Sequence, residues 1–170
     1  YGFTVIPSGS GLLACGDVGS GRLPEEGVLV DYVLRELACK KDLRGKKIVV
    51  SAGATQEPMD PVRCLPNHTT GKMGYAVARA CMLRGAEVTL LTSTGCTLPP
   101  VPFVNRVPFT TAADLFEAVQ QHAMDADALV MAAAVADYRP ARVAQDKVKK
   151  HEGSLTLALE RTQDILAWVG

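Results

Sequence analysis

The sequence lacks an excess of charge, a long apolar run and a paired cysteine motif. Its 18 basic and 18 acidic residues cancel to a formal net charge of zero, so no overall field attracts nucleic acid or an acidic membrane, and any anion site must be local. No apolar run approaches the roughly 20 residues that cross a bilayer. The five cysteines are scattered without a C-x-x-C pair, so neither a zinc site nor a disulfide framework is indicated. We therefore expect a cytoplasmic protein that binds neither nucleic acid nor a membrane.

The short motifs of common nucleotide-binding folds are also missing. The stretch from Ser51 to Thr55, SAGAT, is not the G-x-G-x-x-G of dinucleotide-binding proteins, and no Walker A spacing occurs. A Y-x-x-x-K pair is absent as well. An oxidoreductase or other dinucleotide-binding module is thus a disfavoured alternative, which a titration of NADPH against CTP would test. Residue 1 is tyrosine and no signal peptide follows, which predicts an excised piece of a longer chain.

What the chain does contain is an ordinary globular composition, 48% hydrophobic and 21% charged, arranged in alternating strand and helix patterns. Such alternation predicts βαβ units and therefore a doubly wound, mainly parallel, Rossmann-like α/β sheet. Strands are expected at 47–51, 87–92, 105–109, 128–136 and 155–159, and helices at 73–84, at 112–123 and from 164 onward.

The first 44 residues do not have the pattern of a complete domain. A strand is expected at 1–6, followed by a glycine-rich arm, and glycine at this density permits backbone shapes that other residues cannot hold. A helix with an apolar stripe is expected at 24–39. The charged hinge that follows predicts a domain boundary, with an arm and linker at 1–44 and an α/β domain at 45–170.

The long polar loop after the first buried strand is the first candidate site, because ligands of open α/β sheets bind at the carboxyl ends of the strands. Asn67 lies in this loop, and its carboxamide could hold a carbonyl oxygen that gains charge, or it could cap its own loop. Thr69, Thr70 and Gly71 lead into the next helix, where free N–H groups and the helix dipole could bind an anion. The alternative for these residues is simple capping of the helix.

Three further stretches contain residues that could take part in binding or catalysis. Small residues at 132–136 end in Asp137, a carboxylate that could hold Mg²⁺ or a ribose hydroxyl, or could serve as a turn residue after tightly packed alanines. The cluster KVKK, which begins at Lys147, could bind a triphosphate or could be a solvated charge run. Cys15, in the glycine-rich arm, is either a reactive thiol or a small buried residue.

Taken together, long motifs in this chain resemble a known enzyme family. The stretches SAGATQEPMDPVRCLPNHTTGKMG, AAAVADYRP, KVKK and TQDIL closely resemble the phosphopantothenoylcysteine synthetase (phosphopantothenate–cysteine ligase) family of coenzyme A biosynthesis. The stretch GLLACGDVGSGRL resembles the C-terminal clamp of phosphopantothenoylcysteine decarboxylase, a flavoprotein. A decarboxylase followed by a ligase is the order of the bacterial bifunctional enzymes. The resemblance makes 1–44 the decarboxylase tail and linker, and 45–170 a ligase domain that lacks its C-terminal part.

The resemblance implies a reaction and its partners. The carboxylate of 4′-phosphopantothenate attacks CTP, an acyl-cytidylate forms with loss of pyrophosphate, and the amine of cysteine then attacks the activated carbonyl. Mg²⁺ accompanies the nucleotide. FMN belongs to the decarboxylase part, which lies outside this chain and converts the product to 4′-phosphopantetheine. The family implies a homodimeric ligase domain within a larger homo-oligomer.

The resemblance also assigns roles to residues. Asn67 matches the family's active-site asparagine at the acyl group, Lys147 matches its catalytic lysine at the nucleotide, and Cys15 matches the proton donor of the decarboxylase. The remaining matches are nucleotide contacts at Met131, Ala132, Ala133, Asp137, Gln163, Asp164, Ile165 and Leu166. Thr69, Thr70 and Gly71 are expected to contact the phosphate or acyl group of the substrate because of their position before the helix. Gln163 stands where the family usually has proline. The partners of Cys15 and the last part of the ligase are absent, so no decarboxylation is expected, and a non-catalytic nucleotide-binding fragment is the alternative.

Overall fold

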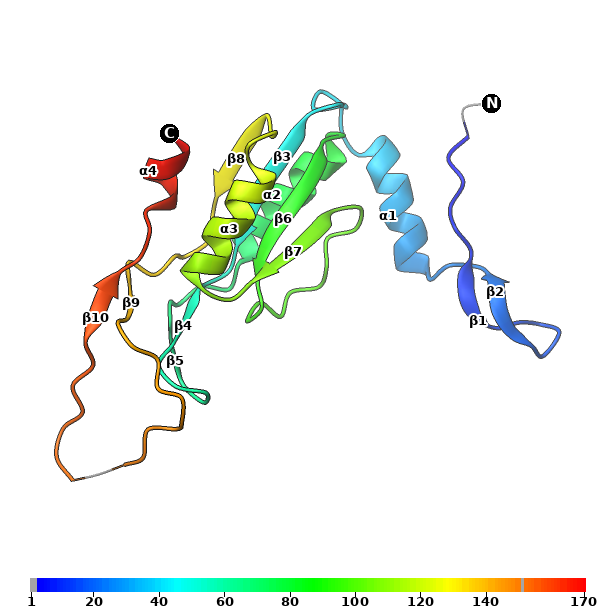
Figure 1. Ribbon diagram of the computed structural model, residues 1–170. Helices are drawn as coiled ribbons and strands as arrows, with labels where there is room; N and C mark the ends of the chain where they lie inside the picture. Colours follow the sequence, from blue (N-terminus) through cyan, green and yellow to red (C-terminus); the bar gives the residue numbers. More distant parts are fainter. Residues whose placement is uncertain (1–2, 151) are drawn as a thin grey trace.

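The computed structural model describes residues 3–150 and 152–170 (Figure 1). Its centre is a four-stranded parallel sheet in the order β7–β6–β3–β8. The predicted parallel α/β sheet is confirmed, and in the middle of the sheet Val50 pairs with Leu90 on one side and with Val130 on the other. The strands span Lys47–Ala52 (β3), Glu87–Ser93 (β6), Asn105–Phe109 (β7) and Ala128–Met131 (β8).

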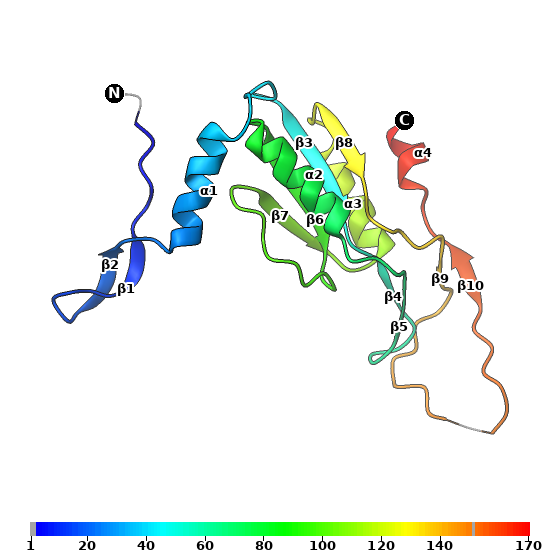
Figure 2. The same ribbon diagram turned by 180° about the vertical axis from the view of Figure 1, so that it is seen from behind.

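Two helices cover opposite faces of this sheet, α2 (Lys72–Leu83) and α3 (Ala112–His122), as Figures 1 and 2 show together. Successive strand residues point to opposite faces, so β3 supplies both cores. Val50 belongs to the core under α2, whereas its neighbour Val49 packs with Leu115 of α3. The doubly wound arrangement therefore follows from an uninterrupted apolar strand that is buried on both sides.

Local signals place the helix ends where the sequence predicts them. Thr111 caps α3 by accepting a hydrogen bond from the Asp114 N–H, while the Asp114 carboxylate accepts one from the Thr111 N–H, which makes a complete capping box. Gly85 follows the last turn of α2 with a φ of 92°, a conformation that glycine adopts without strain. The C-terminal helix α4 (Ile165–Val169) begins after Asp164, whose carboxylate accepts a hydrogen bond from the Ala167 N–H.

Two strand predictions are wrong in extent. The strand predicted at 128–136 ends at Met131, because the next two N–H groups donate to the Ser51 hydroxyl instead of continuing the ladder, and only an isolated bridge between Ala54 and Ala134 follows. The strand predicted at 155–159 is replaced by a shorter one. This strand, β10 (Leu159–Arg161), pairs antiparallel with β9 (Tyr138–Pro140) outside the central sheet. The long loop after β3 also contains a small hairpin of β4 (Gln56–Pro58) and β5 (Cys64–Pro66).

The N-terminal region differs more from expectation. Residues 3–6 of the strand predicted at 1–6 have no regular structure, and residues 1–2 lie outside the described part. The glycine-rich arm instead forms an antiparallel hairpin of β1 (Gly9–Leu12) and β2 (Val18–Arg22). The predicted linker helix is present as α1 (Glu26–Leu37), but it buries none of its residues. Within the described chain, no helix is both long enough and apolar enough to cross a bilayer.

Candidate nucleotide-binding site

The carboxyl end of β3 organises the end of β8 through one hydroxyl group. The Ser51 side chain is completely buried, and its oxygen accepts hydrogen bonds from the N–H groups of Ala132 and Ala133, each at 3.1 Å. The same hydroxyl donates to the sulfur of Met131 at 3.6 Å. Because buried polar groups are costly unless they are bonded, this triple contact holds the strand end in one conformation.

The next residues are fixed in the same way. The Ala134 N–H donates to the Gly53 carbonyl at 2.8 Å, and the Ala134 carbonyl accepts from the Thr55 N–H at 3.1 Å. The buried Thr55 hydroxyl then accepts a hydrogen bond from the Ala136 N–H at 2.9 Å. The small residues at 132–136 thus present a rigid backbone surface at the carboxyl edge of the sheet, where a flat ligand could approach closely.

Asn67 reaches this surface from the β4–β5 region. Its side-chain nitrogen donates to the Ala134 carbonyl at 3.2 Å, across a separation of 67 residues. The amide therefore joins its loop to the strand end rather than capping its own turn. Asn67 is exposed, and the carboxamide oxygen and the second amide hydrogen remain as groups that a substrate can contact.

The start of α2 lies beside the same edge. Thr69 and Thr70 each accept a long hydrogen bond, from the Gly71 N–H at 3.3 Å and from the Lys72 N–H at 3.4 Å. Gly71 has a φ of 75°, and a Cβ there would lie 3.1 Å from the Gly53 nitrogen, so this position requires glycine. The N-cap of α2 is Gly71, which has no side-chain capping hydrogen bond, so the two threonines order the loop just before the helix, and the helix dipole stays directed toward the loop surface.

Two segments that are distant in sequence line one hollow of about 720 Å³ beside the end of β8. The Thr162 hydroxyl donates to the Ala136 carbonyl at 2.6 Å and the Thr162 N–H donates to the Asp137 carbonyl at 3.0 Å, which joins the two segments. Ala132 is not among the lining residues, although its neighbours Met131 and Ala133 are. The other predicted nucleotide contacts of these segments line the hollow together, namely Met131, Ala133, Asp137, Gln163, Asp164, Ile165 and Leu166.

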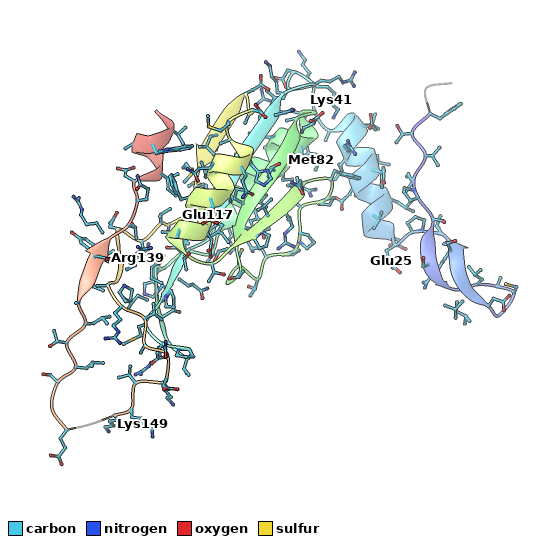
Figure 3. All side chains as sticks on the ribbon, viewed as in Figure 1. Glu25, Lys41, Met82, Glu117, Arg139 and Lys149 are labelled. Atoms are coloured by element: carbon cyan, nitrogen blue, oxygen red, sulfur yellow. The ribbon has the colours of Figure 1, made fainter. Side chains whose placement is uncertain are left out.

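Lys147 lies elsewhere. It lines a second hollow with Arg63, Lys149 and Lys150, on the loop between β9 and β10. Figure 3 labels Lys149, and this loop extends away from the sheet there. The structure therefore brings together the predicted strand-end contacts but keeps the predicted catalytic lysine in a separate basic cluster.

The sequence interpretation missed the pair that shapes this basic cluster, Asp60 and Arg63. The Asp60 side chain is fully buried, and its carboxylate accepts two hydrogen bonds from Arg63 at 2.6 and 3.0 Å. These bonds hold the pKa of Asp60 well below its usual range, although burial by itself would raise the pKa. An acid and an arginine three positions apart around Pro61 are the signal that could have indicated the pair.

Cys15 lies in the turn between β1 and β2, at the end of the molecule opposite α4 (Figure 1). The residue is exposed, so the expectation of a small buried cysteine is wrong. Its sulfur lies 3.8 Å from the Asp17 carboxylate, within its own hairpin. The structure thus does not bring Cys15 to the other candidate residues.

A family model described as the DNA/pantothenate metabolism flavoprotein C-terminal domain matches residues 43–170. The Coenzyme A biosynthesis bifunctional protein CoaBC of Mycobacterium tuberculosis (strain H37Rv) is 47% identical over 173 residues, which cover 99% of this chain and 41% of that protein. The CoaBC protein of Escherichia coli (strain K12) is 42% identical over 163 residues, which cover 94% of this chain and 40% of that protein.

A solved structure, the crystal structure of the C-terminal domain of Coenzyme A biosynthesis bifunctional protein CoaBC, superposes with a TM-score of 0.66 at 42% identity. The match covers 75% of this chain and 59% of that one. The chain spans about two fifths of the length of the curated relatives it matches. By sequence and by fold, the chain belongs to the family of the DNA/pantothenate metabolism flavoprotein C-terminal domain.

Proposed function

We propose that this chain carries the phosphopantothenate–cysteine ligase activity of coenzyme A biosynthesis, with residues 45–170 as the ligase part and 1–44 as an arm and linker. One observation carries the proposal. The two segments that resemble the nucleotide contacts of the ligase family, 131–137 and 163–166, line one hollow at the carboxyl edge of the sheet. The relatives are named as bifunctional proteins of coenzyme A biosynthesis, which agrees with this activity.

The proposed reaction has two steps. A carboxylate oxygen of 4′-phosphopantothenate attacks the α-phosphorus of CTP, which forms an acyl-cytidylate and releases pyrophosphate. The amine of cysteine then attacks the acyl carbon, so that an amide bond forms, CMP leaves and the amine loses a proton. Both steps need the reactants to be held in line and water to be kept out, and positioning of this kind lowers barriers substantially.

Asn67 is proposed to stabilise the acyl oxygen during these steps. Its bond to the Ala134 carbonyl fixes the amide plane, so the second amide hydrogen can be aimed at a substrate without further ordering. A pre-oriented donor of this type favours an oxygen on which negative charge develops. The α2 N-terminus, with Thr69, Thr70 and Gly71, is proposed to accept an anionic group of the substrate.

Mg²⁺ fits the nucleotide hollow, because Asp137 and Asp164 both line it. Two carboxylates suit this ion, which takes one or two of them and completes its shell with phosphates and water. When bound, Mg²⁺ neutralises phosphate charge. Lys147 is proposed to contact the triphosphate, which requires the loop between β9 and β10 to close over the nucleotide together with the β4–β5 turn to which it is bonded.

FMN and decarboxylation are assigned to parts of the natural protein other than these residues. Cys15 is exposed on a hairpin and its one described polar contact lies within that hairpin, which does not form a flavin pocket by itself. No step of the proposed ligase reaction involves Cys15. A homodimeric ligase domain within a larger homo-oligomer remains part of the proposal, and analytical ultracentrifugation of the natural protein would test it.

The test is release of pyrophosphate from CTP by the natural protein that contains this chain. With 4′-phosphopantothenate and Mg²⁺ present, we expect pyrophosphate before cysteine is added, and the amide product afterwards. Omission of 4′-phosphopantothenate is the control. Pyrophosphate release that does not depend on 4′-phosphopantothenate, or tight binding of NADPH without binding of CTP, would contradict the ligase assignment.

A further inference from the structure

The buried carboxylate of Asp60 accepts five hydrogen bonds from described residues. One oxygen accepts hydrogen bonds from the N–H groups of Val62 and Arg63, both at 2.8 Å. The other accepts from Arg63 Nε at 3.0 Å, from Arg63 Nη2 at 2.6 Å and from the Val148 N–H at 3.1 Å. All five partners donate, so the site suits a carboxylate, whereas an asparagine would turn its own N–H₂ group toward donors.

The contact between Asp60 and Val148 spans 88 residues, and it is one of two bonds that hold the N–H and the carbonyl of Val148. While Asp60 accepts from the Val148 N–H, Arg63 Nη2 donates to the Val148 carbonyl at 2.6 Å. A third bond, from the Ala144 N–H to the Met59 carbonyl at 3.0 Å, joins the same two loops. Val148 lies between Lys147 and Lys149, so the Asp60–Arg63 pair holds the backbone from which these two lysines project.

We propose that Asp60 is a positioning residue that latches the lysine segment 147–150 to the β4–β5 turn through Val148 and Arg63. The consequence for catalysis rests on the proposed ligase function, in which Lys147 contacts the triphosphate. Lysine has a long, flexible side chain, so an unanchored backbone would spread its ammonium group over many positions. Because the backbone beside Lys147 is held, the ammonium group of Lys147 has fewer accessible positions before the nucleotide binds.

Limited trypsin digestion tests the latch without any assay of activity. In the natural protein, the bond after Lys147 is the one that joins it to the latched Val148. We expect Asp60→Asn to increase the rate of cleavage there by about tenfold or more, because charge-assisted hydrogen bonds are lost. The control is Asp125→Asn, which removes the same charge from an exposed residue that is distant in sequence from Asp60 and from the scissile bond. Mass spectrometry identifies the cleaved bond.

Arg63→Lys provides a second variant in case Asp60→Asn fails to fold. The Arg63 side chain is 42% exposed, so its replacement places less demand on the fold. A lysine keeps the charge but cannot make the two bonds to Asp60 and the bond to Val148 in the same geometry. We expect faster cleavage after Lys147 here too. If cleavage in both folded variants matches the wild-type protein, the latch does not hold this segment and the proposal is overturned.

A double-mutant cycle tests whether Asp60 acts through Lys147. In the proposed reaction, Asp60→Asn should lower kcat/KM for CTP by about tenfold or more in the wild-type background, but by less than about threefold when Lys147→Gln is already present. Equal losses in both backgrounds would mean that Asp60 has only a general structural role. Absence of CTP-dependent activity in the wild-type protein would refute the proposed function instead, and the trypsin experiment would still decide the latch.

Discussion

Two regions of the molecule are held in place by different physical means. One is the hollow at the end of β8, here called the strand-end hollow. The other is the loop between β9 and β10 that contains Lys147, Lys149 and Lys150, here called the lysine loop.

Around the hollow, the backbone of residues 132–136 bonds the buried hydroxyls of Ser51 and Thr55, which lie at and just after the end of β3, next to the completely buried Val50. Among the described residues, the lysine segment 147–150 bonds no buried strand and is instead joined to the β4–β5 turn, mainly by Asp60 and Arg63. Hydroxyl groups buried at the edge of the core therefore fix the proposed nucleotide pocket, whereas an ion pair with a buried carboxylate orders the proposed catalytic lysine.

This difference suggests that the strand-end hollow stays rigid during the reaction while the lysine loop moves. A pocket whose backbone is bonded to the edge of the core is rigid before ligand binds, because cores are packed densely and resist local change. A loop joined by a few hydrogen bonds opens at a lower cost than the core does, and such regions supply the parts of enzymes that move during catalysis. Substitutions in the two regions should consequently differ in kind, with losses of chemistry or of global stability at the sheet and losses of local order at the loop.

The largest effect is expected for Asn67→Asp at the strand-end surface. A carboxylate would stand beside an acyl oxygen that gains negative charge, so turnover should fall on the order of 10²–10³-fold. Folding should survive, because the Ala134 carbonyl keeps its bond from the Thr55 N–H. Steady-state amide formation and thermal melts measure the two effects. Asn105→Asp, at the start of β7, is the matched control, and near-normal turnover of Asn67→Asp with an unchanged melt would make Asn67 structural.

In the loop, Lys147→Gln should lower turnover by about ten- to a hundredfold, the worth of one well-placed charge-assisted contact. Lys150→Gln is the matched control, because it removes the same charge from the same hollow and should cost much less. Both variants should melt like the wild-type protein, since both lysines are exposed. Equal, small losses at the two positions would show that the lysines act only as solvated surface charges.

Gly74→Ala should affect the stability of the sheet region. A Cβ at Gly74 would lie 2.6 Å from both the Ser51 carbonyl oxygen and the Ala52 Cβ, so α2 would have to move away from β3. Overpacking of this kind costs about 1–3 kcal/mol of unfolding free energy, which urea denaturation measures. In Gly27→Ala, the new Cβ on α1 meets nothing within 4 Å and should improve helix propensity. A stability of Gly74→Ala at or above that of the wild type would contradict the close packing of α2.

The smallest expected effect concerns pH and the latch. Because the folded-state pKa of Asp60 is lowered, its stabilising contribution is fully present above the unfolded-state value of about 3.9 and is lost as pH falls below it. The Val148 amide resonance in NMR spectra should therefore stay constant from neutral pH down to about pH 4. Circular dichroism at each pH controls for unfolding. A titration of this resonance centred at or above pH 4 would show that Asp60 does not hold the Val148 amide.

Much of the core could be predicted from local patterns. Buried parallel strands are continuous apolar runs, and the run at 47–52 is β3. The cap at Thr111 was predictable because a capping box involves residues only three positions apart. The extent of β8 was not predictable in this way. ALVMAAAVA has strand character throughout, but its pairing ends where the Ser51 hydroxyl, 81 residues away in sequence, takes the next N–H group.

The candidate site shows the same limit. The family resemblance named residues within 131–137 and 163–166, and the structure shows that all of them except Ala132 line one hollow. Lys147 was named by the same resemblance, yet the structure places it with Arg63 in another hollow. Whether predicted residues lie together depends on the conformation of the loops between them. Loops contain no periodic pattern from which that conformation could be predicted.

By itself, the sequence determined the parallel sheet, the helix boundaries and the family, because each of these depends on residues that are close in the chain or on long contiguous motifs. Only the tertiary structure decided that Asn67 bonds the strand end, that Asp60 is buried, and that Asp60 and Arg63 hold Val148. These contacts join residues 67 to 88 positions apart. A buried polar group takes its partners from whatever the fold brings within about 3 Å, and that depends on the packing of the whole chain.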